Sequence, residues 1–181
     1  QEQLDSQAMA VTGVSPALSP QLLKEARSQA KWIGIRHEEC ETKELLDPSY
    51  TTNPRDRCFA CKKELHLHLK HITKTSEGFQ IVDGVNNDDL SDHRPGIEAA
   101  RQAGVLSPLA ELQINKFSVR LISLALGLPW WNKPAQPCLA SRFPYGEKIS
   151  AEKLKVVDKA EQWLRSHGFA EVRVRNQGLA A

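Results

Sequence analysis

The sequence predicts an α/β protein: a parallel sheet with helices on both faces, plus a small C-terminal α+β domain. Segments typical of strands, at residues 9–14, 33–42 and 79–83, alternate with helical patterns that begin near Ser19 and Cys61. The order β, α, β, α, β favours parallel strands joined by helical crossovers. The 181 residues are 40% hydrophobic and 25% charged, which is the ordinary range for a chain with a globular core.

The first half of the chain opens with a βα unit. Residues 9–14 form a short apolar run rich in β-branched side chains, as a buried strand would. Ser19 and Pro20 are typical of the N-cap and the first position of a helix. A polar stretch at 47–56 is interrupted by prolines and is expected to be a surface loop, whereas 61–74 is expected to be helical.

The second half contains two long helical patterns, at 117–126 and 150–167. The stretch between them, 130–146, contains prolines and shows no periodicity. Such a stretch inside a compact domain is usually functional or mobile. A last strand signal lies at 172–174, and a domain boundary is plausible near Pro144.

The charge and hydropathy patterns exclude several classes of protein. The net charge is +2 and the basic residues are scattered, so nucleic acid is an unlikely partner and any phosphate must be held locally. No apolar run approaches the roughly 20 residues of a membrane helix, and the N-terminus has no signal-peptide pattern. We expect a soluble cytoplasmic protein without a membrane partner.

Three cysteines are the first candidates for chemistry: Cys58 and Cys61, spaced as CxxC, and Cys138 in the irregular stretch. Three thiolates suit an iron–sulfur cluster with one open iron, whereas tetrahedral zinc needs a fourth ligand. The fourth ligand of a zinc site could be Cys40 or one of three histidines, His66, His68 and His71. Because Cys61 is in helical register with Leu65 and Leu69, it could also be a buried core thiol.

Asn86, Asp88 and Asp89 follow the strand candidate at 79–83, on a turn that begins with Gly84. Their oxygens could bind Mg²⁺ or a ribose hydroxyl. Side chains of this type are also common in turns because they cap their own backbone. The pattern alone leaves both interpretations open.

Charged residues near the C-terminus suggest a phosphate site. Arg173 and Arg175 alternate along a strand candidate and so share a face, where with Arg142 they could bind a phosphate. Exposed arginines on a strand edge are the alternative. Glu161, on the helix at 150–167, is a candidate ligand of a divalent ion, or else belongs to a solvated helix face.

Several short motifs stand out along the chain: AVTGVSP at 10–16, RCFACK at 57–62, DGVNNDDL at 83–90, RPG at 94–96, SPL at 107–109, NKP at 132–134 and CLASRFPYG at 138–146. Together they resemble the LarE family of ATP-dependent sulfur transferases, in the PP-loop superfamily. The resemblance implies the PP-loop type of fold, similar to the adenine nucleotide alpha hydrolases, with an α/β domain at 1–144 and the start of a C-terminal sulfur-transferase domain at 145–181.

The resemblance implies an enzyme that adenylates a pyridinium dicarboxylate mononucleotide with ATP and Mg²⁺. The carboxylate is then converted to a thiocarboxylate, for nickel-pincer cofactor biosynthesis, with release of AMP and pyrophosphate. In one branch of the family a single cysteine, matching Cys138, gives up its sulfur. In another, three cysteines matching Cys58, Cys61 and Cys138 hold a [4Fe-4S] cluster, and the chain resembles this branch.

The resemblance also assigns binding residues and an assembly. Substrate phosphate would be held by Ser141, Arg142, Arg173 and Arg175. The activated acyl group would lie near Asn86, Asp88 and Lys116. A homo-oligomer is expected, with a small-molecule nucleotide as substrate.

The family's nucleotide loop, Ser-Gly-Gly-x-Asp-Ser, would precede the strand at 9–14, and the sequence does not contain it. We therefore expect an interruption of the natural chain between Leu4 and Asp5. Two rival functions are a zinc-stabilised binding or scaffold domain and a tRNA-thiolating relative. The lack of a basic face argues against tRNA binding.

Overall fold

The computed structural model describes residues 4–75 and 78–178, which form two compact units. Of the described residues, the first unit comprises 4–57 and 137–178, and the second comprises 58–75 and 78–136. Pro144 therefore lies inside the first unit, and the division at 144/145 stays a prediction about domains. No described helix is both long and apolar enough to cross a lipid bilayer.

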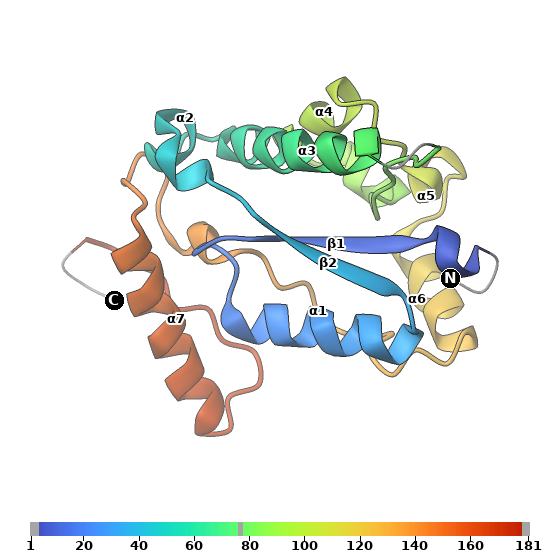
Figure 1. Ribbon diagram of the computed structural model, residues 1–181. Coiled ribbons are helices and arrows are strands. Elements are labelled where there is room, and N and C mark those ends of the chain that lie inside the picture. Colours follow the sequence, from blue (N-terminus) through green and yellow to red (C-terminus); the bar gives the residue numbers. More distant parts are fainter. Residues whose placement is uncertain (1–3, 76–77, 179–181) are drawn as a thin grey trace. The chain divides into compact units, whose positions relative to one another are not determined.

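A small parallel sheet forms the centre of the first unit. Strand β1 (Met9–Val14) pairs with β2 (Arg36–Glu41), in a register that places Met9 opposite Arg36 and Val14 opposite Glu41. Helix α1 (Pro20–Ile33) connects the two strands and lies along one face of the sheet (Figure 1). Ser19 is its N-cap and Pro20 its first residue, as predicted. The βαβ start of the fold is thus confirmed.

The end of α1 explains why β2 begins later than predicted. Gly34 has φ 75°, a left-handed conformation, and its N–H bonds to the carbonyl of Ala30. Glycine adopts this conformation without the steric cost of a Cβ. The helix therefore continues to Ile33, within the region predicted as strand.

The predicted surface loop at 47–56 is wrong. It contains helix α2 (Pro48–Thr51), capped by the Asp47 side chain, which accepts from the N–H of Ser49. Tyr50 is 2% exposed and Asn53 is fully buried. The short 3-10 helix η2 (Glu44–Leu46) precedes it. The polar composition concealed two inward-facing residues, because turn residues can be buried when they bond to a neighbouring segment.

Two further segments complete the first unit. The 3-10 helix η4 (Leu139–Arg142) lies in the irregular stretch, and helix α7 (Ala151–Ser166) follows it as predicted, with the Ser150 side chain accepting from the N–H of Lys153. Residues 172–174, predicted as a strand, have no strand structure. At the other end, the 3-10 helix η1 (Asp5–Gln7) precedes β1, and Gln7 N donates to Leu4 O at 2.8 Å. The interruption expected between Leu4 and Asp5 stays a prediction.

The second unit is helical. Its elements are α3 (Arg57–Thr75), η3 (Asn87–Ser91), α4 (Pro95–Gln102), α5 (Pro108–Glu111) and α6 (Lys116–Ala125). The strand predicted at 79–83 is wrong, because only Val82 forms a bridge, parallel to Leu106. Val82 is 59% exposed, so its apolar run does not face a core. Helices α3 and α4 are in contact at Gly96, where an added Cβ would lie 3.0 Å from Lys62 Cγ.

Candidate functional site

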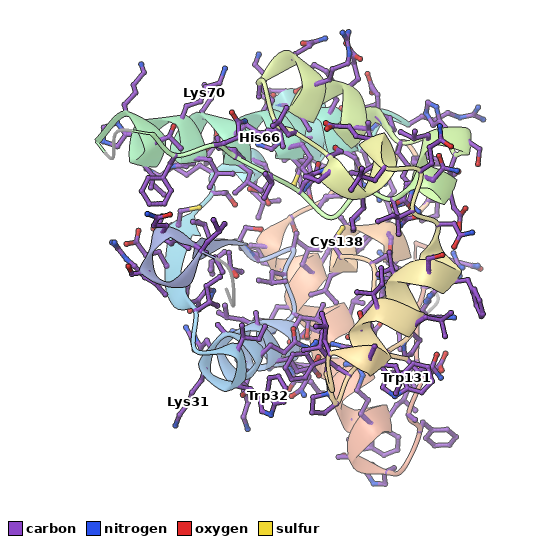
Figure 2. The ribbon with its side chains drawn as sticks, turned by 90° about the vertical axis from the view of Figure 1, so that its right-hand side faces the viewer. Lys31, Trp32, His66, Lys70, Trp131 and Cys138 are labelled. Carbon is purple, nitrogen blue, oxygen red and sulfur yellow. The ribbon has the colours of Figure 1, made fainter. Side chains whose placement is uncertain are left out.

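The segment around Cys138 is held by its apolar neighbours. Leu139 and Ala140 are 2% and 0% exposed, and Leu139 N donates to the carbonyl of Ala17 at 2.9 Å. Cys138, directly before them, is exposed (Figure 2). Burial of the two following residues thus fixes the backbone while the thiol remains accessible to solvent.

A buried ion pair joins η4 to α7. Arg142 Nε donates to Glu161 Oε1 at 2.7 Å and Nη2 to Oε2 at 3.1 Å, a two-pronged arrangement. The two side chains are 5% and 0% exposed. Glu161 also accepts from Arg165 Nη2 at 2.8 Å and from the N–H of Val174 at 3.1 Å. The pair therefore connects three segments of the first unit: η4, α7 and the segment around Val174.

These contacts correct the interpretation of Glu161. It does not lie on a solvated helix face. A carboxylate has about four acceptor positions, and four donors occupy them here. Burial alone would raise the Glu161 pKa, but the hydrogen bond and charge of Arg142 outweigh it and hold that pKa below its usual value. A divalent ion would have to displace one of these donors, so the ion role stays a hypothesis without structural support.

Arg142 acts on the backbone at Cys138 rather than as an open phosphate ligand. Its Nη1 donates to the carbonyls of Pro137 at 2.9 Å and Cys138 at 3.2 Å, and to Ser141 Oγ at 2.8 Å. Ser141 Oγ in turn donates to the carbonyl of Cys138 at 2.9 Å. Both side chains thus hold the backbone of the loop that contains Cys138, and their role as phosphate ligands stays a prediction.

A cavity of about 370 Å³ opens beside this loop. Its lining includes Ser141 and Arg142, and also Arg57, Tyr145, Arg175 and Asn176. Three of these side chains are arginines, and none of the described lining residues is acidic. Such a cavity is suited to an anion.

Arg57 is the member of this site that sequence reasoning missed. It is 6% exposed, its Nε has no hydrogen-bond partner among the described residues, and its guanidinium carbon lies 5.5 Å from the centre of the Tyr145 ring. A buried donor without a partner is costly, which favours an anion beside it. Arg173 is exposed and is not among the residues that line the cavity. The sequence signal that could have identified Arg57 is its position directly before the CxxC pair.

Asn53 bonds to the segment 143–146, part of which lines the cavity. Its Nδ2 donates to the carbonyl of Pro144 at 2.7 Å and more weakly to that of Phe143 at 3.4 Å. The backbone carbonyl of Asn53 accepts from Gly146 N at 2.9 Å. Asn53 has φ 54°, a left-handed conformation that asparagine tolerates better than most residues. The conformation and the hydrogen bonds together position residues 143–146.

The other two candidate cysteines lie in the second unit. Helix α3 begins at Arg57, not near Cys61 as predicted, so Cys58 and Cys61 lie one turn apart within its first two turns. Cys58 is exposed and Cys61 is half-buried, and none of the four cysteines is disulfide-bonded. Within either unit, no three described His, Cys, Asp or Glu side chains are grouped to hold a metal ion. Convergence of the three cysteines stays a prediction.

The residues expected near the acyl group are brought together in the second unit. Asn86 Oδ1 accepts from Asp88 N at 3.1 Å, and Asn86 Nδ2 donates to Asp89 Oδ2 at 2.6 Å, so this turn is capped by its own side chains. Asp88 Oδ2 also accepts from the backbone N–H of Lys116 at 3.0 Å. The turn interpretation is confirmed, and the proximity of Asn86, Asp88 and Lys116 agrees with a shared role.

Comparisons with known proteins give three relatives, while no family model matches the chain. An uncharacterised protein of Synechocystis, slr1717, is 55% identical over 174 residues, which are 96% of this chain and 65% of that protein. Pyridinium-3,5-bisthiocarboxylic acid mononucleotide synthase of Lactiplantibacillus plantarum is 34% identical over 92% of this chain and 60% of its own length. The chain is similar to this synthase. That similarity supports the resemblance to the LarE family.

A third relative, uncharacterised protein MJ0830 of Methanocaldococcus jannaschii, is 34% identical over 68% of this chain and 48% of its own length. The chain thus spans about half to two thirds of the length of the curated relatives that it matches.

Proposed function

We propose that the chain is the greater part of a LarE-type sulfur transferase with the PP-loop fold. The observation that carries this proposal is the 34% identity to the mononucleotide synthase over 92% of the chain. The reaction would begin with transfer of AMP from ATP to a carboxylate of a pyridinium dicarboxylate mononucleotide, releasing pyrophosphate. A sulfide equivalent would then displace AMP and leave a thiocarboxylate.

The cationic cavity is the proposed site for the phosphate of the mononucleotide. Arg57 and Arg175 would bind the phosphate oxygens. Arg142 and Ser141 hold the carbonyl of Cys138, so the thiol and the bound phosphate would be positioned by one loop. Arg173, exposed on the segment before Arg175, would assist from outside the cavity.

Cys58, Cys61 and Cys138 are the proposed holders of a [4Fe-4S] cluster. The donor set fits such a group, because Cys58 and Cys138 are exposed and Cys61 is half-buried, and three thiolates leave one iron without a protein ligand. When bound, the cluster would supply a replaceable sulfide for transfer. Lys116, Asn86 and Asp88 are proposed to lie near the acyl group, and adenylation with Mg²⁺ is proposed for the whole protein.

The direct test is a product assay with the full-length natural protein. The protein is purified without oxygen and incubated with pyridinium-3,5-dicarboxylate mononucleotide, ATP, Mg²⁺ and sulfide, and mass spectrometry follows the replacement of oxygen by sulfur. We expect wild-type protein and Cys40→Ser to form the thiocarboxylate together with AMP and pyrophosphate. We expect Cys138→Ser to form none. A fully active Cys138→Ser variant would refute the proposal.

The phosphate site has its own test in the same assay. Arg57→Gln and Arg175→Gln each remove a charged donor, worth about 1.5–3 kcal/mol, so we expect KM for the mononucleotide to rise about ten- to hundredfold. Arg55→Gln is the matched control, since Arg55 is exposed and does not line the cavity. An unchanged KM in both cavity variants would place the phosphate elsewhere.

A further inference from the structure

A second cavity lies between α3 and α4, within the second unit, and has a volume of about 220 Å³. Its α3 side includes Leu67 and four residues that recur at helical spacing and so share one face: Phe59, Lys63, His66 and Lys70 (Figure 2 labels His66 and Lys70). Ala99 and Ala103 line its α4 side. The proposed phosphate site is in the first unit, so this cavity is a separate feature.

His66 points to a ligand in this cavity. Its side chain is buried, with the residue 4% exposed, yet neither Nδ1 nor Nε2 has a hydrogen-bond partner among the residues described. Leaving a buried polar group unsatisfied costs about 1–3 kcal/mol. Burial, and then the charge of Lys62, hold the His66 pKa below its usual range, so the ring is neutral at neutral pH and offers one N–H donor.

The charges around His66 favour an anion. Lys63 and Lys70 are exposed at the rim of the cavity. Glu98, the acidic residue of α4, binds Arg101 Nη2 at 2.8 Å and Gln102 Nε2 at 2.7 Å instead of either lysine. Asp83 is the acidic residue whose charge acts to raise the His66 pKa, against the effects of burial and of Lys62. Lys63, Lys70 and His66 thus line a space that no described carboxylate lines.

The wall of the cavity favours an organic anion over an inorganic one. Phe59 supplies an aromatic ring, and Leu67, Ala99 and Ala103 supply aliphatic surface. An inorganic ion would leave this surface in contact with water, whereas an apolar group would cover it. We propose that this cavity binds a small organic anion, with its charged oxygens on Lys63, Lys70 and His66 and its apolar body on Phe59 and the alanines of α4.

The test uses the 181-residue protein and three probes: benzoate, its uncharged analogue benzamide, and inorganic phosphate. Binding is followed by NMR of the His66 ring nitrogens and by thermal unfolding. We expect benzoate to shift the His66 signals saturably and to bind at least about fivefold more tightly than benzamide or phosphate. Lys63→Gln and Lys70→Gln should each weaken benzoate about two- to fivefold, as expected of exposed charge pairs.

Lys155→Gln is the matched control, because Lys155 is exposed on α7 in the other unit and lines neither cavity. Its affinity for benzoate should equal that of wild type. His66→Gln should weaken benzoate and benzamide alike, because a neutral His66 offers the same N–H to both, whereas the lysine variants should reduce the preference for benzoate. The lysine variants keep the test decisive if His66→Gln does not fold. Equal binding of benzoate and benzamide, tighter binding of phosphate, or no response of His66 would each overturn the proposal.

Discussion

Two acidic residues on one helix illustrate how the surroundings decide the effect of a charge. Glu161 and Asp158 are one turn apart on α7, and both are buried. Glu161 has two arginine partners, whereas Asp158 accepts from Gln162 Nε2 at 2.6 Å. The groups that favour the charged form of Asp158, Ser19 and Arg165 among them, do not offset its burial. Burial raises the Asp158 pKa, whereas the Glu161 pKa is lowered. The two carboxylates should therefore affect stability in opposite directions.

Replacing Glu161 should strongly destabilise the protein. Glu161→Gln leaves Arg142 as a buried charge without its partner, and removing one member of a buried pair costs about 3–5 kcal/mol. Urea unfolding at neutral pH measures this loss. Glu171→Gln, at an exposed position, is the control and should change the free energy of unfolding by less than about 0.5 kcal/mol.

The pH dependence provides a second measurement of the same pair. Because the Glu161 pKa is lowered on folding, its stabilising contribution is complete above its usual pKa of 4.5 and is lost as the pH falls through the lower folded value. Wild-type protein should lose this contribution on acidification. If Glu161→Gln shows the same acid-dependent loss as wild type, the ion pair is not its cause.

Replacing Asp158 should have the opposite effect. A carboxylate whose pKa is raised on folding destabilises the folded state once it is ionised, so Asp158→Asn should stabilise the protein at neutral pH, by about 1 kcal/mol or less. The gain should disappear as the pH falls below the usual pKa of 3.8, where both states are protonated. A thermal-unfolding series from neutral to acidic pH would test this, and a destabilised variant at neutral pH would contradict it.

Single residues were predictable where the signal was local. Ser19 is recognisable as a helix cap from its immediate neighbours, and Asn86 as a turn residue. The pairing of Arg142 with Glu161 was not, because the two are 19 residues apart and meet only through packing of η4 on α7. Arg57 was missed because the residues around it, such as Tyr145, are far from it in the sequence and come near it only in the folded structure.

At the scale of elements, two apolar runs show which part of strand formation a single sequence can predict. The run at 9–14 is a strand because β2 is available to pair with it. The run at 79–83 has similar apolar character but finds only Leu106 as a bridge partner. Hydrophobicity indicates that a segment can pair, and the presence of a partner decides whether it does. The bounds of α6 and α7 agree with the predicted ones to within one residue, because caps and glycines are local signals, whereas α3 begins before the predicted start at Cys61.

The link between α2 and the 143–146 segment can be tested at Asn53. Asn53→Ala removes the hydrogen bond to Pro144 O and places an alanine at φ 54°, so it should lower stability by about 2–3 kcal/mol. Asn53→Gly removes the same hydrogen bonds without the backbone strain and should cost less. Urea unfolding of both variants provides the comparison. Equal losses would mean that the backbone conformation contributes nothing.

At the scale of the whole molecule, the proposed function predicts that three cysteines from the two units bind one cluster. Cys138 belongs to the first unit, and Cys58 and Cys61 to the second. After anaerobic reconstitution of the full-length protein, we expect about four irons and four labile sulfides per chain, with loss of the cluster in Cys58→Ser, Cys61→Ser and Cys138→Ser. Cys40→Ser should retain it, because Cys40 lies on β2, in register with Gly13. A zinc site of four thiolates would instead bind zinc without sulfide and would depend on Cys40. A cluster that persists in Cys138→Ser would contradict the three-cysteine assignment, and sulfur transfer by Cys138 alone would become the better mechanism.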